Sequence, residues 1–394
     1  MNGDSDESIL DASTFQDTCG ESLESVLNLD TWEQDPNLAD LCRRIEDEIE
    51  KAVQDEDELS REARRQVAAV LSDPTRPGAP PSAGLYRVSK EDLQRVWRQV
   101  LFNGAVEVCD GTCKPFETLP ITITQIGVCL ASYQGCVQSY AHRIYQRDLR
   151  IRSGDLMNDL MALLDRRKAR SQDDAERAQG ISVLARRGIL AYAERAALAY
   201  KSDAPWRMGH GHPAPFELLT GSGSMELLRS SLSMLRDLIA GHKRFVFVPS
   251  EAADKRLLTL GYALRSGEYA IITTAQTQMT NIVEGGKYNP DDGKRALRFC
   301  EEIGPQIAIG AYRVSVSAPP YLFYSHVEHS HEAALIALAD SLLLEYRGFP
   351  LLIDLADRLC RASFGNDIFE DAIQSAYARA GAPFRFLGER QTRD

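Results

Sequence analysis

Residues 105–132 read AVEVCDGTCKPFETLPITITQIGVCLAS, and this stretch decides the expected fold. Residues 105–109 predict a strand that runs into a turn at Asp110–Thr112, because Asp and Gly favour turns. Residues 121–132 form a continuous apolar run rich in β-branched side chains, which predicts a second and well-buried strand. The Asp110 carboxylate is therefore expected to project from the edge of a sheet, between two strands.

Helices and strands alternate in much of the remaining chain. A helix expected at residues 252–264 separates strands expected at 245–248 and 269–274, which is the βαβ-type alternation of α/β proteins. Further strands are expected at 307–316 and 322–324, and further helices at 90–101, 134–168, 173–200 and 225–240. We therefore expect an α/β fold in which helices flank a sheet.

The N-terminal residues differ in composition from the rest of the chain. Residues 1–36 are rich in Asp, Glu, Ser and Asn and have too few apolar side chains to offset the entropy of ordering, so we expect a disordered acidic tail. Residues 37–85 predict amphipathic helices followed by a linker rich in Pro and Gly. The main domain is expected to cover residues 86–394, with the helices before it as an N-terminal helical extension.

Charge is unevenly distributed along the chain. The net charge is −12, but the first 60 residues hold 19 Asp and Glu against three basic residues, so the remaining residues sum to +4. A mildly basic body behind an acidic tail does not exclude a nucleic-acid partner.

The composition also indicates a compartment. No apolar run approaches the roughly 20 residues that span a bilayer, and the N-terminus lacks the basic and then apolar pattern of a leader. Eight cysteines in 394 residues are sparse, which fits a reducing environment. We therefore expect a cytoplasmic protein that does not enter a membrane.

Two acidic residues are candidates for chemistry. Asp110 offers the hard oxygen ligands that Mg²⁺ and Mn²⁺ prefer, although an Asp-Gly turn is also ordinary structure. Glu217 lies in the apolar stretch 216–219, where an acid either points to solvent or has a buried role. The loop that follows holds Ser222 and Ser224 before a predicted helix, so its hydroxyls and amides could bind phosphate or only cap the helix.

Basic residues are candidates for contacts with nucleic-acid phosphates. Arg143 and Arg147 lie in the basic helix expected at 134–168, and Lys243 and Arg244 precede an expected strand. Neighbouring acids make an ordinary solvated face an equal alternative to phosphate contact for the basic helix.

Two further clusters indicate other ligands. His326, His329 and His331 are spaced so that they could share a zinc ion in an irregular segment, with helix capping as the alternative. Asp354 and Asp357 are three residues apart on an expected helix and so share a face, either as metal ligands or as a surface stripe.

These segments, in this order, resemble the NurA family of DNA repair nucleases. In that family a strand ends in Asp-Gly-Ser, matched here by Asp110–Thr112, and a glutamate precedes a second Asp-Gly-Ser by five residues, as Glu217 precedes Ser222–Ser224. A Gly-Tyr-Pro segment followed by Ala-His is matched by Gly348–Pro350 and Ala356–Asp357. The similarity spans roughly residues 105 to 391.

The resemblance implies a fold and a set of partners. It implies a ribonuclease-H-like mixed sheet flanked by helices, a homodimer, and a HerA-like hexameric ATPase as the partner protein. It also implies DNA as the substrate and Mn²⁺ or Mg²⁺ as the cofactor, with Asp110 and Glu217 as metal ligands and water as the nucleophile.

The chain departs from the family pattern at three positions. Ser222 stands where the family has a carboxylate, Phe349 where it has a tyrosine, and Asp357 where it has a histidine. Asp357 could replace a lost ligand if its helix packs beside Asp110 and Glu217, which makes it the third candidate catalytic residue. The alternatives left open are a competent nuclease, a non-catalytic DNA-binding adaptor, and an unrelated zinc hydrolase built on the three histidines.

Overall fold

The computed structural model describes most of the chain and divides it into two compact units. The units are Met1–Glu62 and Ala63–Asp394. The described residues are 15–16, 19–32, 37–71, 73, 75–118, 121–147, 157–158, 161, 183–251, 257, 260–261, 263–286 and 288–383. Each unit is a separate structural element of the chain.

The N-terminal unit is helical. Helix α2 (Leu23–Leu27) begins where the Ser22 side chain accepts a hydrogen bond from the Ser25 amide, and a 3-10 turn, η1 (Leu29–Thr31), follows it. Local structure therefore starts earlier than the predicted disordered tail allows, because serine and asparagine caps stabilise these short turns. The rest of that tail prediction lies outside the described residues.

Helix α3 (Leu38–Leu71) is a single helix of 34 residues, whereas the sequence predicts separate helices. It begins in the N-terminal unit and ends in the larger one, where Leu71 is buried. The side chain of Arg64 donates hydrogen bonds to both carboxylate oxygens of Glu268, at 2.7 and 2.9 Å. The C-terminal end of α3 is therefore part of the larger unit.

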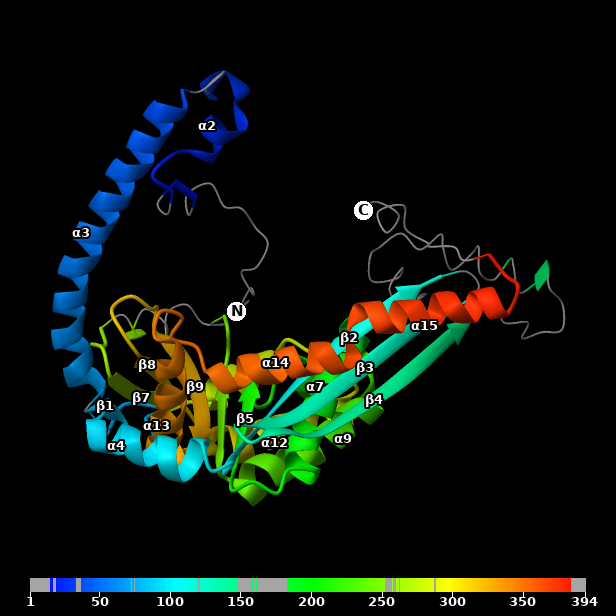
Figure 1. The fold of residues 1–394 in the computed structure, drawn as a ribbon. Coiled ribbons are helices and arrows are strands. Elements are labelled where there is room, and N and C mark those ends of the chain that lie inside the picture. Colours follow the sequence, from blue (N-terminus) through cyan, green and yellow to red (C-terminus); the bar gives the residue numbers. More distant parts are fainter. Residues whose placement is uncertain are drawn as a thin grey trace. The chain divides into compact units, whose positions relative to one another are not determined.

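The larger unit is built on one mixed sheet, which within the described residues has nine strands in the order β1-β7-β8-β9-β6-β5-β2-β3-β4 (Figure 1). The predicted α/β class with a mixed sheet is confirmed. The strands are β1 (Gly84–Arg87), β2 (Val106–Glu117), β3 (Ile121–Ser132), β4 (Gly135–Arg147), β5 (Trp206–His210), β6 (Phe245–Val248), β7 (Glu268–Thr274), β8 (Ile307–Arg313) and β9 (Tyr321–His326).

Only the centre of the sheet is parallel. Strand β5 pairs in parallel with both β2 and β6, and the other pairs are antiparallel. The predicted βαβ unit between β6 and β7 is wrong, because β6 pairs with β9 on its other side and β7 pairs with β1 and β8. Sequence alternation does not reveal this, since it fixes the order of elements along the chain but not their neighbours in space.

Strand β2 continues through the turn predicted at Asp110–Thr112. Its pairing with β3 runs unbroken from Val108, opposite Ala131, to Glu117, opposite Thr122. The turn prediction is therefore wrong: a continuous ladder of cross-strand hydrogen bonds overrides the local preference of Asp and Gly.

The helix predicted at residues 134–168 is wrong over residues 135–147, whereas the described residues 157, 158 and 161 are helical. Residues 135–147 form β4, which pairs with β3 from Gly135 to Arg147. Its pairing with β3 decides this conformation, since the tight turn after Ser132 places these residues directly beside β3. Nearly all of residues 148–168 lie outside the described chain.

Helices cover both faces of the sheet, and the alternation of side chains along β6 shows the two layers. Phe245 and Phe247 belong to a core with α7, α9, α11 and α12, whereas Val246 and Val248 belong to a core with α4, α13 and α14. The helix bounds are α4 (Lys90–Val96), α7 (Val183–Tyr200), α8 (Phe216–Leu219), α9 (Met225–Arg236), α11 (Gln276–Glu284), α12 (Pro290–Ile303), α13 (Ser330–Ser341), α14 (Leu351–Phe364) and α15 (Asn366–Arg379).

Short helical turns complete the chain: η2 (Trp97–Leu101), η3 (Gly221–Gly223), η4 (Asp237–His242), η5 (Gly304–Gln306), η6 (Val327–His329) and η7 (Leu342–Leu344). The helices predicted near 90–101, 173–200 and 225–240 correspond to α4 with η2, to α7, and to α9 with η4. In the described ranges, no helix is both long enough and apolar enough to cross a bilayer.

Strands β2, β3 and β4 extend beyond the rest of the sheet as a three-stranded arm, and α15 lies along this arm (Figure 1). Phe116 of β2 packs against Phe369 of α15, with ring centroids 6.3 Å apart, and Ile373 completes this small core.

Candidate functional site

Asp110 lies where the parallel part of the sheet ends. Strand β2 pairs with β5 only as far as Cys109, opposite Gly209, and β5 itself ends at His210. From Asp110 onward, β2 still pairs with β3 but no longer pairs with β5 on its other side. Such an opening at the carboxyl ends of parallel strands is where α/β proteins commonly place their binding sites.

Gly111 allows helix α7 to approach this opening. A Cβ atom at Gly111 would lie 2.6 Å from Cδ1 of Leu190 and 2.9 Å from Oε1 of Glu194. A larger side chain would displace the ends of the Leu190 and Glu194 side chains. The glycine therefore brings the Glu194 carboxylate against the backbone next to Asp110.

Burial and two neighbouring carboxylates raise the pKa of Asp110. Burial, followed by the negative charges of Glu194 and Asp357, raises the pKa of Asp110 to about 7, although a hydrogen bond from the Gly111 amide and the charge of Arg195 act against the shift. Burial also raises the pKa of Glu194 above its ordinary value, and Arg195 opposes this. Asp110 therefore lies within electrostatic reach of both Glu194 and Asp357.

Arg195 is the buried cation of the site, with a side chain only 5% exposed. It forms an ion pair with Glu194 and donates hydrogen bonds at 2.9 Å to the carbonyl oxygens of His210 and His212. Its guanidinium carbon lies 5.4 Å from the centroid of the Phe247 ring. Arg195 therefore connects α7 to the end of β5, and it offsets the negative charge of one carboxylate, that of Glu194.

Helix α14 brings Asp357 to the opposite side of the opening. The Asp357 carboxylate is 35% exposed and accepts a hydrogen bond from Arg361 at 2.9 Å. Burial and Arg195 lower the pKa of His210, while Asp357 and Asp354 act to raise it, so the imidazole is neutral at pH 7. His210 Nε2 lies 3.0 Å from Ser250 Oγ.

The carboxylates do not form a ready-made cage for a metal ion. Within the part of the chain that the structure describes, no three His, Cys, Asp or Glu side chains are arranged to hold one ion together. Magnesium, however, is usually held by one or two carboxylates, with water and substrate phosphate completing its octahedral shell. The crowded charge at Asp110, which keeps its pKa near 7, fits such a partly formed site.

Glu217 and its serine loop lie behind α7 in this arrangement. Glu217 is the second residue of α8. Its charge raises the pKa of Glu194, but this is the smallest of the effects that act on the pKa of Glu194. The Ser222 hydroxyl donates to the Glu217 carbonyl at 3.2 Å, and the Ser224 hydroxyl caps α9 by accepting from the Leu227 amide. Ser222 has a left-handed backbone with φ of 49° and packs its hydroxyl against Gly188 of α7. Both serines therefore have structural roles.

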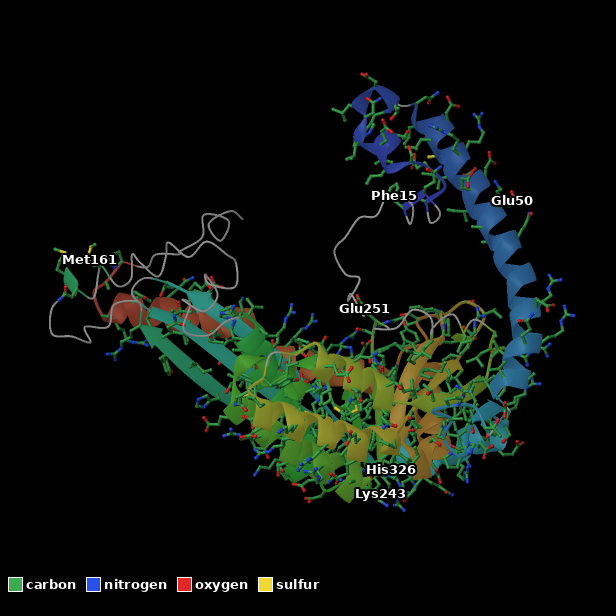
Figure 2. The ribbon with its side chains drawn as sticks, turned by 180° about the vertical axis from the view of Figure 1, so that it is seen from behind. Phe15, Glu50, Met161, Lys243, Glu251 and His326 are labelled. Carbon is green, nitrogen blue, oxygen red and sulfur yellow. The ribbon has the colours of Figure 1, made fainter. Side chains whose placement is uncertain are left out.

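The predicted basic residues are divided between two distant places. Lys243 and Arg244 precede β6, at the amino ends of the parallel strands, whereas Asp110 follows the carboxyl ends. Lys243 forms an ion pair with Glu328 at 2.8 Å, close to His326 (Figure 2). Arg143 and Arg147 are exposed on β4, along the three-stranded arm. The structure thus does not bring these four residues together.

The three histidines have separate partners. The His326 ring, 1% exposed, accepts a hydrogen bond from the Glu328 amide and lies 3.4 Å from the Gln306 side chain. His331 Nδ1 lies 2.9 Å from the Tyr269 hydroxyl, and the His329 ring packs edge-on against Trp206. The predicted zinc site is not assembled: the His326 and His329 rings lie 6.3 Å apart, but no three His, Cys, Asp or Glu side chains of the described residues are grouped to hold one ion.

No family model and no curated protein sequence matches the chain. Among solved structures, it is similar to the NurA nuclease from Sulfolobus solfataricus, with 8% identity over 70% of this chain and 84% of that chain and a TM-score of 0.39. It is also similar to a NurA structure with manganese, with 9% identity over 73% of this chain and 95% of that chain and a TM-score of 0.41.

The fold resembles that of NurA nucleases. A further similar structure is an endonuclease V from Bacillus subtilis, with 7% identity over 69% of this chain and 82% of that chain and a TM-score of 0.31.

Two of the three departures from the NurA pattern lie at the opening. The Phe349 ring lies 6.0 Å from the His210 ring, edge to face, and the charge of Asp357 contributes to the raised pKa of Asp110. The third departure, Ser222, lies on the far side of α7 from the strand. The candidate site is therefore made by β2, α7, β5 and α14.

Sequence reasoning missed Glu194, Arg195 and His210. One signal was available: an adjacent acid and base interrupt the otherwise apolar run of residues 189–199, where charged side chains are costly unless they are paired. His210 carried no such signal, because a single histidine after a short strand is common.

Proposed function

We propose that this chain is a divalent-metal-dependent DNA nuclease whose site is built on Asp110, Glu194 and Asp357. The observation that carries the proposal is the raised pKa of Asp110, at about 7, which burial and two neighbouring carboxylates cause. Perturbed acids in an opening of this kind are typical of functional sites.

The charge balance of the site supports a cation. Arg195 pairs with Glu194 and offsets its charge, which leaves the charges of Asp110 and Asp357 without a buried cation among the described residues. A bound Mg²⁺ or Mn²⁺ would supply charge neutralisation at a phosphate and lower the pKa of a water molecule. Asp110 and Glu194 would hold it, and the charge of Asp357 would help to attract it.

His210 is suited to a separate role. Because its pKa is lowered, the imidazole is neutral at pH 7 and can accept a proton on the side of the opening that faces Asp357. The sequence predicts Glu217 as a metal ligand. We do not place it among the ligands, because it interacts with Glu194 alone among these acids.

For the substrate, we propose that Arg143 and Arg147 contact DNA phosphates. Both are exposed on β4, which belongs to the same three-stranded arm as Asp110. Lys243 and Arg244 are at the other end of the parallel strands and would contact a different part of a long duplex. The HerA-like ATPase partner and the homodimer remain predictions from the sequence resemblance.

The test is cleavage of linear DNA by the purified full-length chain in Mn²⁺ or Mg²⁺, with and without chelator. We expect metal-dependent degradation, and we expect Asp110→Asn and Glu194→Gln to reduce its rate by at least about 100-fold, since each removes a ligand. Glu226→Gln, at an exposed position in the first turn of α9, is the matched control and should retain full activity.

Two results would change the assignment. Full activity in Asp110→Asn would exclude this site from the reaction. DNA binding without cleavage in either metal would support the second candidate, a non-catalytic adaptor, which is favoured by the absence of a three-ligand cage among the described side chains.

A further inference from the structure

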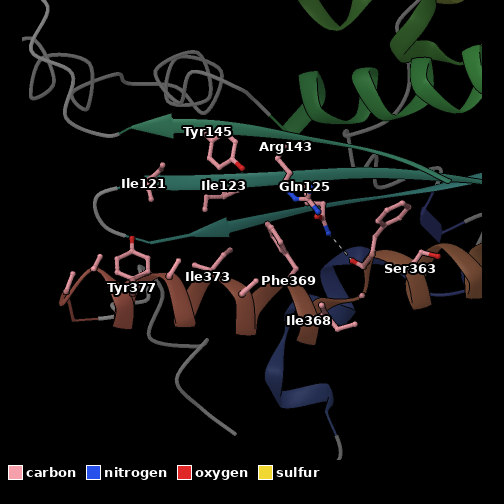
Figure 3. A pocket seen from close by; sticks show the side chains of 16 residues that line it. Ile121, Ile123, Gln125, Arg143, Tyr145, Ser363, Ile368, Phe369, Ile373 and Tyr377 are labelled. Carbon is pink, nitrogen blue, oxygen red and sulfur yellow. Dashed lines mark hydrogen bonds between the residues drawn. The ribbon is translucent and has the colours of Figure 1, made fainter.

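A groove of about 670 Å³ lies between the three-stranded arm and α15. Its floor is formed by β3 and β4, and its opposite wall by the end of α14 and by α15 (Figure 3). Most of the lining is apolar, including Ile121, Ile123, Ile368, Phe369 and Ile373. Its volume is within the range of pockets that bind small organic molecules.

Gln125 lies at the inner end of this groove and has an unused hydrogen-bond acceptor. The residue is 3% exposed, and its Nε2 donates to the Phe364 carbonyl at 3.3 Å. Its buried Oε1 has no partner among the described residues. An acceptor buried without a donor costs free energy, so a ligand that brings an N–H group to this point would stabilise the site.

Three side chains of β4 form a row along the sheet face of the groove. Arg143, Tyr145 and Arg147 alternate along the strand, so they project from one face, and they pair with Gln125, Ile123 and Ile121 of β3. Tyr145 is 55% exposed, which leaves its ring available for stacking.

The same row extends onto β2. Lys114 is opposite Gln125 on the other side of β3, so a cation lies on each side of the buried amide. Neither Lys114 nor Arg143 forms an ion pair within the described part of the chain. An aromatic ring between cations is the arrangement by which proteins bind single-stranded nucleic acid.

We propose that this groove binds an unpaired base of a nucleic-acid strand. The base stacks on Tyr145 against the apolar wall of α15, Gln125 Oε1 accepts a hydrogen bond from an N–H group of the base, and Arg143 and Arg147 contact the flanking phosphates. An apolar peptide would contact the same apolar walls. It would use neither the exposed Tyr145 ring between the two arginines nor the buried acceptor of Gln125. The inference rests on the proposed function, because the groove would bind an unpaired segment of the DNA that the nuclease cleaves.

The groove is within reach of the carboxylates. On β3, Cys129 is opposite Asp110, and Gln125 lies four residues further along the same strand. At about 3.4 Å per residue, this separation is about 14 Å. About four stacked nucleotides span it, so one strand can occupy the groove and the opening at once.

The experiment measures binding by the full-length chain in chelator, where no cleavage occurs. The probes are a single-stranded 12-nucleotide DNA with 2-aminopurine at one position, the same DNA with abasic sites in place of bases, and a blunt duplex. We expect 2-aminopurine fluorescence to be quenched on binding, and we expect the abasic strand to bind at least about 5-fold more weakly, since stacking contributes about 1–3 kcal/mol per base.

The variants separate stacking from charge. Tyr145→Ala should weaken binding of the single strand by about 5- to 150-fold and remove the quenching. Tyr140→Ala is the matched control, because Tyr140 is an exposed tyrosine on the opposite face of the same strand. Melting curves of both variants show whether each one is folded, and the fluorescence and abasic comparisons need only the unaltered chain.

The outcomes distinguish this inference from the proposed function. Quenching that depends on Tyr145, together with no cleavage in Mn²⁺, would retain the base site and reject the nuclease. Cleavage by the unaltered chain, with equal binding of abasic and normal strands, would retain the nuclease and overturn the base site. Absence of any single-strand binding would also overturn it and would direct attention to a peptide as the occupant.

Discussion

Replacing Asp110 with Asn should make the protein more stable at neutral and alkaline pH. Burial, and then the charges of Glu194 and Asp357, raise the pKa of this carboxyl group from 3.8 to about 7. The folded state therefore holds the proton more tightly than the unfolded state. Stability from this group is fully present below about pH 4 and is lost as pH rises towards 7. Asparagine has the same shape as the protonated acid and does not ionise.

The magnitude follows from the size of the shift. Each pKa unit corresponds to about 1.4 kcal/mol, so a rise of about three units sets an upper limit of about 4 kcal/mol for the gain in free energy of unfolding. Solvent at the partly exposed opening reduces this, and we expect about 1–2 kcal/mol. For a protein of this size, that gain raises the melting temperature by about 1–3 °C.

The assay is thermal unfolding of both chains in chelator at pH 4, 6 and 8. The advantage of Asp110→Asn should be smallest at pH 4, grow through pH 6 and level off near pH 8. Asp371→Asn, at an exposed position on α15, should show no such trend. Adding Mn²⁺ should stabilise the unaltered chain more than Asp110→Asn. If the melting temperature of Asp110→Asn at pH 8 is equal to or below that of the unaltered chain, the raised pKa of Asp110 is refuted.

Three further substitutions test parts of the same framework. Gly111→Ala places a methyl group 2.9 Å from Glu194 Oε1, so urea unfolding should show a loss of about 1–3 kcal/mol, and cleavage should fall because the end of the Glu194 side chain is displaced; an unchanged midpoint would contradict the close approach. Asp340→Ala removes a fully buried acid that accepts from the Leu352 amide at 2.9 Å, and it should lower the free energy of unfolding by about 3 kcal/mol, a loss that a chemical melt detects. Glu217→Gln should keep most of the cleavage rate, and a loss as large as that of Glu194→Gln would restore Glu217 as a metal ligand.

Much of the fold could be predicted from the sequence because its elements have strong local patterns. The buried strand at β3 and the helix at α9 followed from hydrophobic periodicity, which depends only on nearby residues. The neighbours of β6 could not be predicted, since strand pairing depends on contacts between residues far apart in the chain. The strand at β4 was mistaken for a helix because its pattern is weak and its pairing with β3 decides its conformation.

The candidate site was predicted in part. Asp110 and Asp357 were identified, and the structure brings them within electrostatic reach of each other. Glu194 was missed because its role comes from Gly111, a neighbour in space that is 83 residues away in the chain. Glu217 was favoured instead because its spacing matched a motif, and spacing along the chain does not fix which side of a helix a residue occupies.

The pairing of β1 with β7 determines when the sheet can be completed during synthesis. Gly84 of β1 lies opposite Ile271, so the ribosome must add more than 180 residues before the partner strand exists. At about 5–20 residues per second, this interval is about 10–40 seconds. The arm of β2, β3 and β4 has no such delay, because its strands follow one another directly. The first strand to be synthesised is thus among the last to be paired, and its backbone needs protection from other chains in the interval.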